Sequence, residues 1–289
     1  MTTAVIKSVP ALWPPDWQSD DLAAKMDRLE TVLREYGSLL VAYSGGTDSA
    51  LLATVAERVL GAQAMAVTAD SPSLPRAELA AAVALAEAIG IRHEVIATSE
   101  MDDPSYRANT PDRCYHCKHE LFGRLQRLAQ ERELEVVADG SNLDDRGDYR
   151  PGARAALELA ITHPLQVAGF SKADVRLASK LLGLPTADKP AAACLASRLP
   201  YGTEVTVAAL ARVEASEALL QRLGFSGCRV RLHGEVARIE LAPDQMEAAL
   251  QQREVIAAGL RLAGNQYVTL DLSGYRTGSL NEVLSEVQG

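Results

Sequence analysis

The residue types best suited to chemistry in this chain form two groups, a glycine-rich polar turn and a set of cysteines. The turn reads Ser44-Gly45-Gly46-Thr47-Asp48-Ser49. Residues 38–43 before it are typical of a buried parallel strand, and the apolar run after it is typical of a helix. Two glycines at a strand end, opening a helix, present backbone N–H groups and a positive helix dipole to an anion. Ser44, Thr47 and Ser49 could add hydroxyl donors, and Asp48 could hold a magnesium ion beside a phosphate.

An ordinary strand-to-helix turn capped by a serine or an aspartate is the alternative interpretation of this segment. The full Ser-Gly-Gly-x-Asp-Ser string is more specific, and it resembles the pyrophosphate-binding loop (PP-loop) of the N-type ATP pyrophosphatases. It is not a Walker A loop, because no lysine follows the glycines. The resemblance implies that ATP is cleaved between its α and β phosphates and that AMP is transferred to a substrate.

Three of the four cysteines could form one site. Cys114 and Cys117 are three residues apart in a segment expected to be helical over 111–132, so their thiols would lie on one face. Cys194 lies in an irregular segment that could fold back over the nucleotide site. Three thiolates fit a [4Fe–4S] cluster with one open iron position, or zinc with a histidine (His116 or His119) as fourth ligand. The alternative is a chance pair in a helix plus one buried thiol.

The fourth cysteine belongs to a different pattern. Period-two alternation over the expected strand 228–233 places Cys228 on the apolar face, where it is a small core residue. Arg229 and Arg231 share the opposite face, where two guanidinium groups could bind a phosphate. A solvated charged face, paired to Arg238 and Glu240 across a hairpin, is the alternative, and the pattern alone does not choose between them.

Composition excludes several classes of protein. The chain of 289 residues is 47% hydrophobic but only 4% aromatic, and its formal net charge is −9. The acidic balance argues against broad binding to a nucleic-acid backbone, and no apolar stretch is long enough to span a bilayer. The first twenty residues lack the apolar core of a signal peptide and are rich in proline and tryptophan. We therefore expect an N-terminal extension on a cytoplasmic protein, where cysteines rarely form disulfides.

Strands alternate with helices through the first two thirds of the chain, which predicts an α/β fold with a doubly wound parallel sheet. The expected strands cover residues 38–43, 64–69, 93–97 and 134–138, and the expected helices cover 21–36, 50–56 and beyond, 75–89, 111–132 and 172–182. Ligands bind at the carboxyl ends of such strands. Ser44, Asp70 and Asp139 should therefore converge there.

A polar loop follows the fourth expected strand over residues 139–152. Its position at a strand's carboxyl end favours a site loop over a solvated surface loop. Asp139 and Asp145 could help to hold metal there, and Arg150 could bind a phosphate or a carboxylate.

Three prolines between residues 185 and 203 forbid a long helix, and we place a domain boundary near Pro200. The division is an extension (1–20), a PP-loop domain (21–200) and a smaller α+β domain (201–289). The last is expected to contain helix 207–223, strands 228–233 and 236–241, helix 243–262 and strand 266–271. These elements are too few for an independent catalytic core, so this domain should supply binding groups.

Four motifs together resemble the LarE family. They are Cys194-Leu195-Ala196-Ser197-Arg198-Leu199-Pro200-Tyr201-Gly202-Thr203, Asp148-Tyr149-Arg150-Pro151-Gly152, Arg229-Val230-Arg231, and the closing stretch 267–276. The similarity runs from about Asp21 to the C-terminus. LarE proteins make the pincer nucleotide cofactor of lactate racemase and related nickel enzymes.

The resemblance implies a substrate, a reaction and a set of roles. The substrate would be pyridinium-3,5-biscarboxylic acid mononucleotide, whose carboxylates are adenylated with ATP and Mg²⁺ and then converted to thiocarboxylates. Arg229 and Arg231 would hold the phosphate of the mononucleotide, and Cys194 would act closest to the acyl-adenylate. Pyrophosphate and magnesium would be held by Ser44, Gly45, Gly46, Asp48 and Ser49. Members of the family tend to form homo-oligomers.

The source of the sulfur divides the family. Some members sacrifice the sulfur of a single cysteine that matches Cys194, whereas others carry an extra C-x-x-C pair and are thought to hold an iron–sulfur cluster. This chain resembles the second group, so we expect a [4Fe–4S] cluster on Cys114, Cys117 and Cys194. Sacrificial transfer is the nearest alternative. A further alternative is tRNA thiolation, which the acidic balance disfavours. Two others are amide synthesis of the NAD- or GMP-synthetase type, which gives the three cysteines no role, and a nucleotide-sensing module, which gives Cys194 no role.

Overall fold

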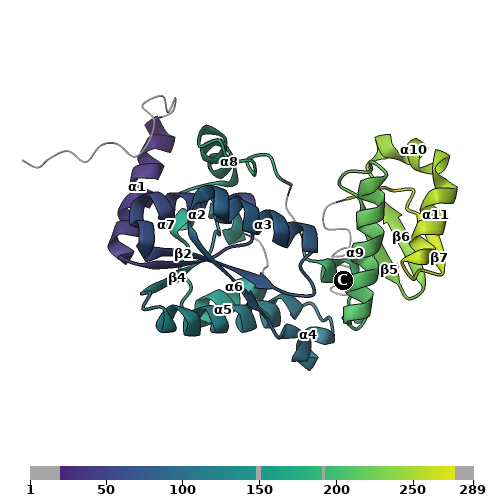
Figure 1. Ribbon diagram of the computed structural model, residues 1–289, viewed down its shortest axis with the longest axis horizontal. Coiled ribbons are helices and arrows are strands. Elements are labelled where there is room, and N and C mark those ends of the chain that lie inside the picture. The colour runs from purple at the N-terminus through teal and green to yellow at the C-terminus, as the bar shows by residue number, and fades with distance from the viewer. Residues whose placement is uncertain (1–19, 148–150, 191–192, 277–289) are drawn as a thin grey trace, which may run out of the picture.

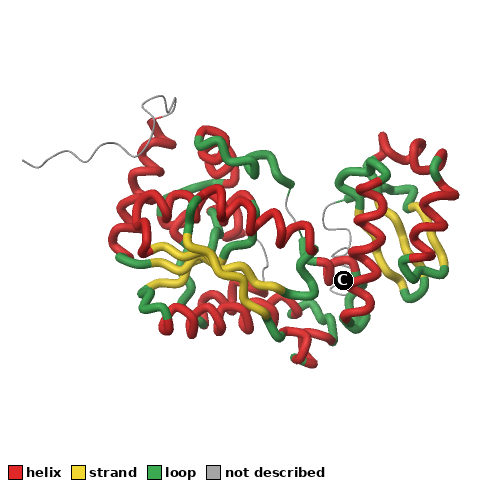
Figure 2. The backbone as a smooth tube through the Cα atoms, viewed as in Figure 1, coloured by secondary structure: helices red, strands yellow, loops and turns green. Residues whose placement is uncertain are grey.

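Four parallel strands form the central sheet of the larger part of the molecule (Figures 1 and 2). The computed structural model describes residues 20–147, 151–190 and 193–276. The strands are β1 (Leu39–Ala42), β2 (Ala64–Asp70), β3 (Arg92–Ala97) and β4 (Val136–Ala138), in the order β3-β2-β1-β4. β1 pairs with β2 from Leu39↔Ala64 and with β4 from Leu39↔Val136. The predicted parallel α/β sheet is confirmed, with strand ends that differ from the prediction by one or two residues.

Helices cover both faces of this sheet (Figure 1). One layer contains α1 (Asp20–Tyr36), α2 (Thr47–Leu60), α3 (Arg76–Ile89), α7 (Pro164–Val167) and α8 (Lys172–Leu181), and the other contains α5 (Arg113–Glu131) and α6 (Pro151–Glu158). Alternation along β1 assigns Leu39 and Val41 to the first core and Leu40 to the second. The doubly wound arrangement follows from apolar side chains on both faces of each strand.

Three short helices were not predicted. They are α4 (Pro104–Arg107), α6 and α7, and the first residue of each is a proline. A single bridge, Ala138↔Thr162, extends the sheet beyond β4. It brings the residues after Thr162 to the carboxyl edge of the sheet, beside the loop that follows β1.

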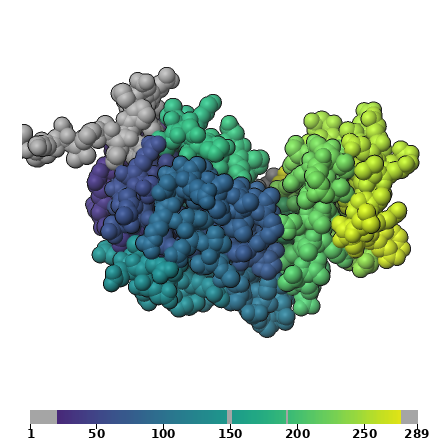
Figure 3. Space-filling view, in the orientation of Figure 1, coloured from purple at the N-terminus to yellow at the C-terminus, as the bar shows by residue number. Residues whose placement is uncertain are grey.

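The smaller C-terminal part is coloured green to yellow in Figure 3, and it has its own mixed sheet, which lies against helices (Figure 1). Its strands are β5 (Arg229–His233), β6 (Val236–Glu240) and β7 (Tyr267–Leu270), and β6 pairs antiparallel with β5 and parallel with β7. Its helices are α9 (Val207–Arg222), α10 (Met246–Gln251) and α11 (Arg253–Leu262). As predicted, Cys228 is a buried core residue, 1% exposed.

The prediction of one helix over 243–262 is wrong. Residues Pro243–Gln245 form a 3₁₀ turn, and the helix is interrupted at Gln252, whose φ of −98° and ψ of 12° are not helical. Between Ala249 and Ile256 no side chain is buried, so nothing fixes one continuous helix face on the core. Sequence periodicity gave no sign of this break.

Part of the core beneath the C-terminal sheet comes from the preceding segment. Leu195, Ala196 and Leu199 pack with Val230, Leu232 and other residues of the C-terminal part in one apolar cluster. Within the described residues, no helix combines the length and the apolarity needed to cross a membrane. The residue ranges of the three expected domains stay a prediction.

Gly140, two residues after β4, controls the distance between that strand and the glycine-rich loop. A Cβ atom on Gly140 would lie 2.7 Å from the Ser49 nitrogen and 2.9 Å from the Asp48 carbonyl carbon. We expect Gly140→Ala to lower the free energy of unfolding by about 1–3 kcal/mol, because backbone must move to admit the methyl group. Urea unfolding followed by circular dichroism measures this.

A matched control is Gly123→Ala within α5. Its Cβ would meet only the Arg127 Nη1 atom, at 3.8 Å. The variant should be more stable than the wild type by about 0.5–1 kcal/mol, from helix propensity alone. Equal effects of the two substitutions would contradict the close approach at Gly140.

Candidate active site

The loop between β1 and α2 is held in a shape that exposes backbone N–H groups. Gly45 has φ 67°, and a Cβ there would lie 2.7 Å from the Ala82 Cβ, so only glycine fits. The Ser49 hydroxyl lies 3.1 Å from the Ser44 hydroxyl and donates to the Gly46 carbonyl at 3.3 Å. Gly46 is the N-cap of α2 and provides no side-chain cap. The uncapped N-terminus is therefore available to a phosphate.

Asp48 is held from two distant elements. The Asn142 amide donates to Asp48 Oδ1 at 3.0 Å, and the Lys172 ammonium forms an ion pair with Asp48 Oδ2. The carboxylate is about one quarter exposed, so it is oriented yet reachable. This geometry suits a group that can exchange a lysine partner for a metal ion.

The other predicted acidic residues have their own partners. Asp70, at the end of β2, is ion-paired with Arg76, and Asp139, directly after β4, lies 2.6 Å from His163 Nδ1. The carboxyl ends of the strands converge as expected, but neither of these side chains lines the cavity beside Asp48. Arg150 lies outside the described residues.

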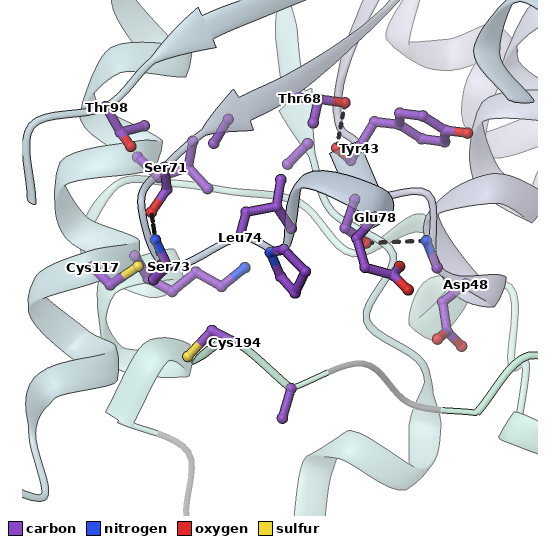
Figure 4. Close-up of a pocket in the computed structure, with 18 of the residues that line it drawn as sticks. Tyr43, Asp48, Thr68, Ser71, Ser73, Leu74, Glu78, Thr98, Cys117 and Cys194 are labelled. Carbon is purple, nitrogen blue, oxygen red and sulfur yellow. Dashed lines mark hydrogen bonds between the residues drawn. The ribbon is translucent and has the colours of Figure 1, made fainter. Parts of the chain in front are cut away.

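One cavity of about 360 Å³ joins the glycine-rich loop to the cysteines (Figure 4). Its wall includes Asp48 at one end and Cys117 and Cys194 at the other, and Ser44 also lines it. Between them lie apolar and hydroxyl side chains of the β2 and β3 ends, among them Val67, Thr68, Leu74 and Thr98. A nucleotide and a sulfur-bearing group could therefore meet in the same enclosed space.

The three predicted cysteine ligands are not all in the cavity wall: Cys117 and Cys194 line it, and Cys114 does not. Cys117 on α5 is half-buried; burial and the nearby Cys194 raise the pKa of its thiol to about 12. Cys114, one helical turn earlier, is exposed, and it interacts electrostatically with Cys117 and with Arg113. Within residues 20–147, 151–190 and 193–276, no group of three or more His, Cys, Asp or Glu side chains has the arrangement of a metal site.

Three buried arginines fix the turn that carries Cys194. Arg198 donates to the carbonyls of Ala193 (2.7 Å) and Cys194 (2.9 Å), and its guanidinium forms a two-pronged ion pair with Glu217. Arg231 donates to Ser197 O at 2.7 Å, and Arg113 donates to Ala196 O at 2.9 Å. The turn is thus oriented through its backbone carbonyls.

The two arginines of β5 have different environments. Arg231 is 6% exposed and ion-paired with Glu240 at 2.9 Å, which is the cross-hairpin pairing that the sequence left open. Arg229 instead lies with its guanidinium 5.3 Å from the Tyr275 ring centroid. Binding of a phosphate by this pair stays a prediction.

Sequence reasoning missed two lysines. Lys189 donates to the Gly45 carbonyl at 3.2 Å and pairs with Glu78, and Lys172 pairs with Asp48. Both line the cavity. The absence of a lysine from the glycine-rich loop was a signal that could have indicated them. A phosphate site without its own lysine needs cations from other segments that return to the same edge of the sheet.

Comparisons with known proteins agree with this geometry. The NAD synthase family model matches residues 22–121. The chain is 48% identical over 267 residues to an uncharacterized Synechocystis protein, covering 92% of this chain and 100% of the relative. It is 37% identical over 268 residues to pyridinium-3,5-bisthiocarboxylic acid mononucleotide synthase of Lactiplantibacillus plantarum, covering 92% and 97% of the two chains. An uncharacterized Methanocaldococcus jannaschii protein is 27% identical over 256 residues, 88% of this chain and 98% of the relative.

The parallel sheet, the PP-loop and the NAD synthase match define an ATP-dependent enzyme of the PP-loop class. Identity of 37% over nearly the whole of both chains assigns the family more narrowly. The chain belongs to the LarE family, as its motifs predicted.

The Arg198–Glu217 pair should be critical for the Cys194 turn. Both side chains are less than one tenth exposed. We expect Glu217→Ala to cost about 3–5 kcal/mol in free energy of unfolding, because it leaves a buried guanidinium without its counter-charge. Chemical denaturation measures the change. Glu30→Ala, which removes the partly exposed partner of the exposed Arg34, is the control and should cost less than about 1 kcal/mol.

The Asp139–His163 pair predicts a pH-dependent stability. The hydrogen bond to Asp139 raises the pKa of His163. Burial raises the pKa of Asp139, but the bond to His163 outweighs this effect, and the pKa of Asp139 is lowered. The stabilisation from His163 is complete below its unfolded pKa of about 6.5 and is lost as the pH rises through the higher folded value. The stability difference between wild type and His163→Gln should therefore shrink from about pH 6 to about pH 9. Urea unfolding at both pH values measures it, and a constant difference would contradict the assignment.

Proposed function

We propose that this enzyme adenylates the carboxylates of pyridinium-3,5-biscarboxylic acid mononucleotide with ATP and converts them to thiocarboxylates. The observation that carries the proposal is the single cavity lined by Asp48 and the PP-loop at one end and by Cys117 and Cys194 at the other. The near full-length identity to a pyridinium-3,5-bisthiocarboxylic acid mononucleotide synthase supports it.

The chemistry assigns a task to each end of the cavity. A carboxylate is a poor acceptor for sulfur, and conversion to an acyl-AMP supplies a good leaving group. The uncapped N-terminus of α2, with Ser44, would bind pyrophosphate, and Asp48 would hold Mg²⁺. Lys172 and Lys189 add positive charge where the phosphates would lie. Sulfur attack on the acyl carbon, with departure of AMP, would then occur beside Cys194.

An iron–sulfur cluster at the cysteine end could carry the sulfur. Cys117 and Cys194 lie in the cavity wall, Cys114 is one helical turn from Cys117, and three thiolates would leave one iron of a [4Fe–4S] cluster open to an outside ligand. The cluster would supply an iron-bound sulfur. A second candidate is sacrifice of the Cys194 sulfur itself, which the position of this residue in the cavity wall also favours.

Several further roles rest on the family resemblance. We propose that Arg229 and Arg231 bind the phosphate of the mononucleotide, that Asp70 and Asp139 support the nucleotide site, and that the chain forms a homo-oligomer in the cytoplasm. Phosphate binding is better supported for Arg229, which lies beside the Tyr275 ring, than for Arg231, which is ion-paired with Glu240.

The test separates the two half-reactions. Purified protein, ATP, Mg²⁺ and the dicarboxylate mononucleotide should yield AMP and pyrophosphate, with a thiocarboxylate product detected by mass spectrometry. Cys194→Ala should still release pyrophosphate but form no thiocarboxylate, because adenylation occurs at the other end of the cavity. A wild-type protein that releases no pyrophosphate with this substrate would contradict the proposed function.

Cys114→Ala distinguishes the two sulfur sources. With a cluster, this variant should lose iron binding and multiple turnovers while pyrophosphate release continues. If Cys114→Ala keeps both iron and repeated turnover, the three-cysteine cluster is wrong. If the wild type holds no iron and each turnover removes the sulfur of Cys194, sacrificial transfer is correct.

A further inference from the structure

The three arginines around the Cys194 turn differ in how their charge is neutralised. Arg198 is 3% exposed and is paired with Glu217, which is 6% exposed. Arg231 is 6% exposed and is paired with Glu240, which is 1% exposed. Each of these buried cations therefore has a buried carboxylate as its counter-charge, the usual condition for a charge away from water.

Arg113 has no such carboxylate. It is 5% exposed, and its Nη1 atom donates to two neutral oxygens, Asn109 Oδ1 and the Ala196 carbonyl. Across the described parts of the chain, no Asp or Glu lies within ion-pair distance of it. Burial lowers the pKa of Arg113, but the nearby Cys194, Cys114 and Tyr106 side chains raise it, so that the net shift is upward. A buried guanidinium beside two sulfurs and without a carboxylate favours negative charge at those sulfurs.

A second buried group at the same place lacks a partner. The Tyr106 side chain is 1% exposed, and its hydroxyl makes no hydrogen bond to any described residue. The Ser73 hydroxyl is close enough to influence it, but the two do not reach hydrogen-bond geometry. Tyr106 packs in one cluster with Cys117 and Cys194. Since buried hydroxyls are normally bonded, this donor also points to an absent acceptor.

One carboxylate does line this end of the cavity. Glu100 is 2% exposed, but it accepts a hydrogen bond from the Ser71 hydroxyl and interacts with Cys117 rather than with Arg113. It therefore adds negative charge on the Cys117 side and leaves the cation at Cys114 and Cys194 uncompensated.

We propose that Arg113 supplies the counter-charge, and Tyr106 a hydrogen bond, for the anionic sulfur species (hydrosulfide or iron-bound sulfide) that the proposed function requires at the cysteine end of the cavity. The proposal rests on the proposed function in one respect, that sulfur is the atom transferred. Binding hydrosulfide breaks no covalent bond of the protein and transfers no electron. Because Arg113 also donates to the Ala196 carbonyl, loading with sulfur is coupled to the position of the Cys194 turn.

Stability measurements without substrate test this directly. The wild type and Arg113→Gln are unfolded in urea without oxygen, alone, with sodium sulfide, and with ferrous iron plus sodium sulfide; bound iron and sulfide are measured in parallel. Without additives, Arg113→Gln should be less destabilised than Arg198→Gln, because no buried carboxylate loses its counter-charge. With the sulfur species, the wild type should gain stability, and Arg113→Gln should bind about tenfold or more weakly, having lost a charge-assisted contact.

Three further variants separate charge from structure. Arg113→Lys should keep part of the binding because it keeps the charge, and Tyr106→Phe should weaken binding without loss of stability, because the missing hydroxyl has no partner. Arg198→Gln should destabilise both the empty and the loaded protein, because it leaves Glu217 unpaired. If Arg113→Gln does not fold, Tyr106→Phe decides the outcome.

The inference is overturned if sulfide, with or without iron, fails to stabilise the wild type, or if it stabilises the wild type, Arg113→Gln and Tyr106→Phe equally. A response to sulfide alone assigns free hydrosulfide as the anion, and a response only with iron assigns iron-bound sulfide. Neither ATP nor the dicarboxylate is present, so a negative result here would leave pyrophosphate release, and with it the adenylation half of the proposed function, unaffected.

Discussion

Hydrogen bonds from buried guanidinium groups to backbone carbonyls are the contacts on which the rest of this active site depends. Arg113, Arg198 and Arg231 each donate to a carbonyl in the turn that carries Cys194. Arg113 belongs to the PP-loop part of the chain and Arg231 to the C-terminal sheet, so the turn is held from both sides. These contacts act together with the Leu195 N–H, which donates to the Ser73 carbonyl at 2.8 Å, and with the packing of Leu195 and Leu199. The Cys194 sulfur is therefore positioned by contacts to an irregular turn and not by a strand or a long helix.

The net charge of the chain does not describe how charge is distributed within the molecule. The chain is acidic overall, with a formal net charge of −9, yet lysines from three distant segments (Lys118, Lys172 and Lys189) line the cavity. A polyanionic substrate is recognised by the local potential in an enclosed cleft, where fields are focused by low-dielectric walls. The lining also contains Asp48, Glu78 and Glu100, so the lysines are local sites of positive charge that the net charge does not describe.

Much of the larger part was predictable because its signals are local. Apolar runs of strand length, glycines at the turn and helical periodicity are encoded within a few residues, so the sheet and the PP-loop matched the prediction. The helix over 243–262 was predicted wrongly, because a stretch with no buried side chain contains no periodic signal to show where it breaks. The environment of Arg231 could be stated only as two alternatives, because a strand pattern gives the face but not what covers it.

The sequence by itself determined the class of fold, the phosphate-binding loop, and which cysteines could carry chemistry. The tertiary structure decided which groups meet: Lys172 with Asp48, His163 with Asp139, and Arg113 with the Cys194 turn. The first of these pairs is separated by 124 residues in the chain. No local pattern encodes such a pairing, because it depends on how the helices and loops return to one edge of the sheet. Counter-charges in particular are a property of the packed molecule, since only burial makes an unpaired charge costly.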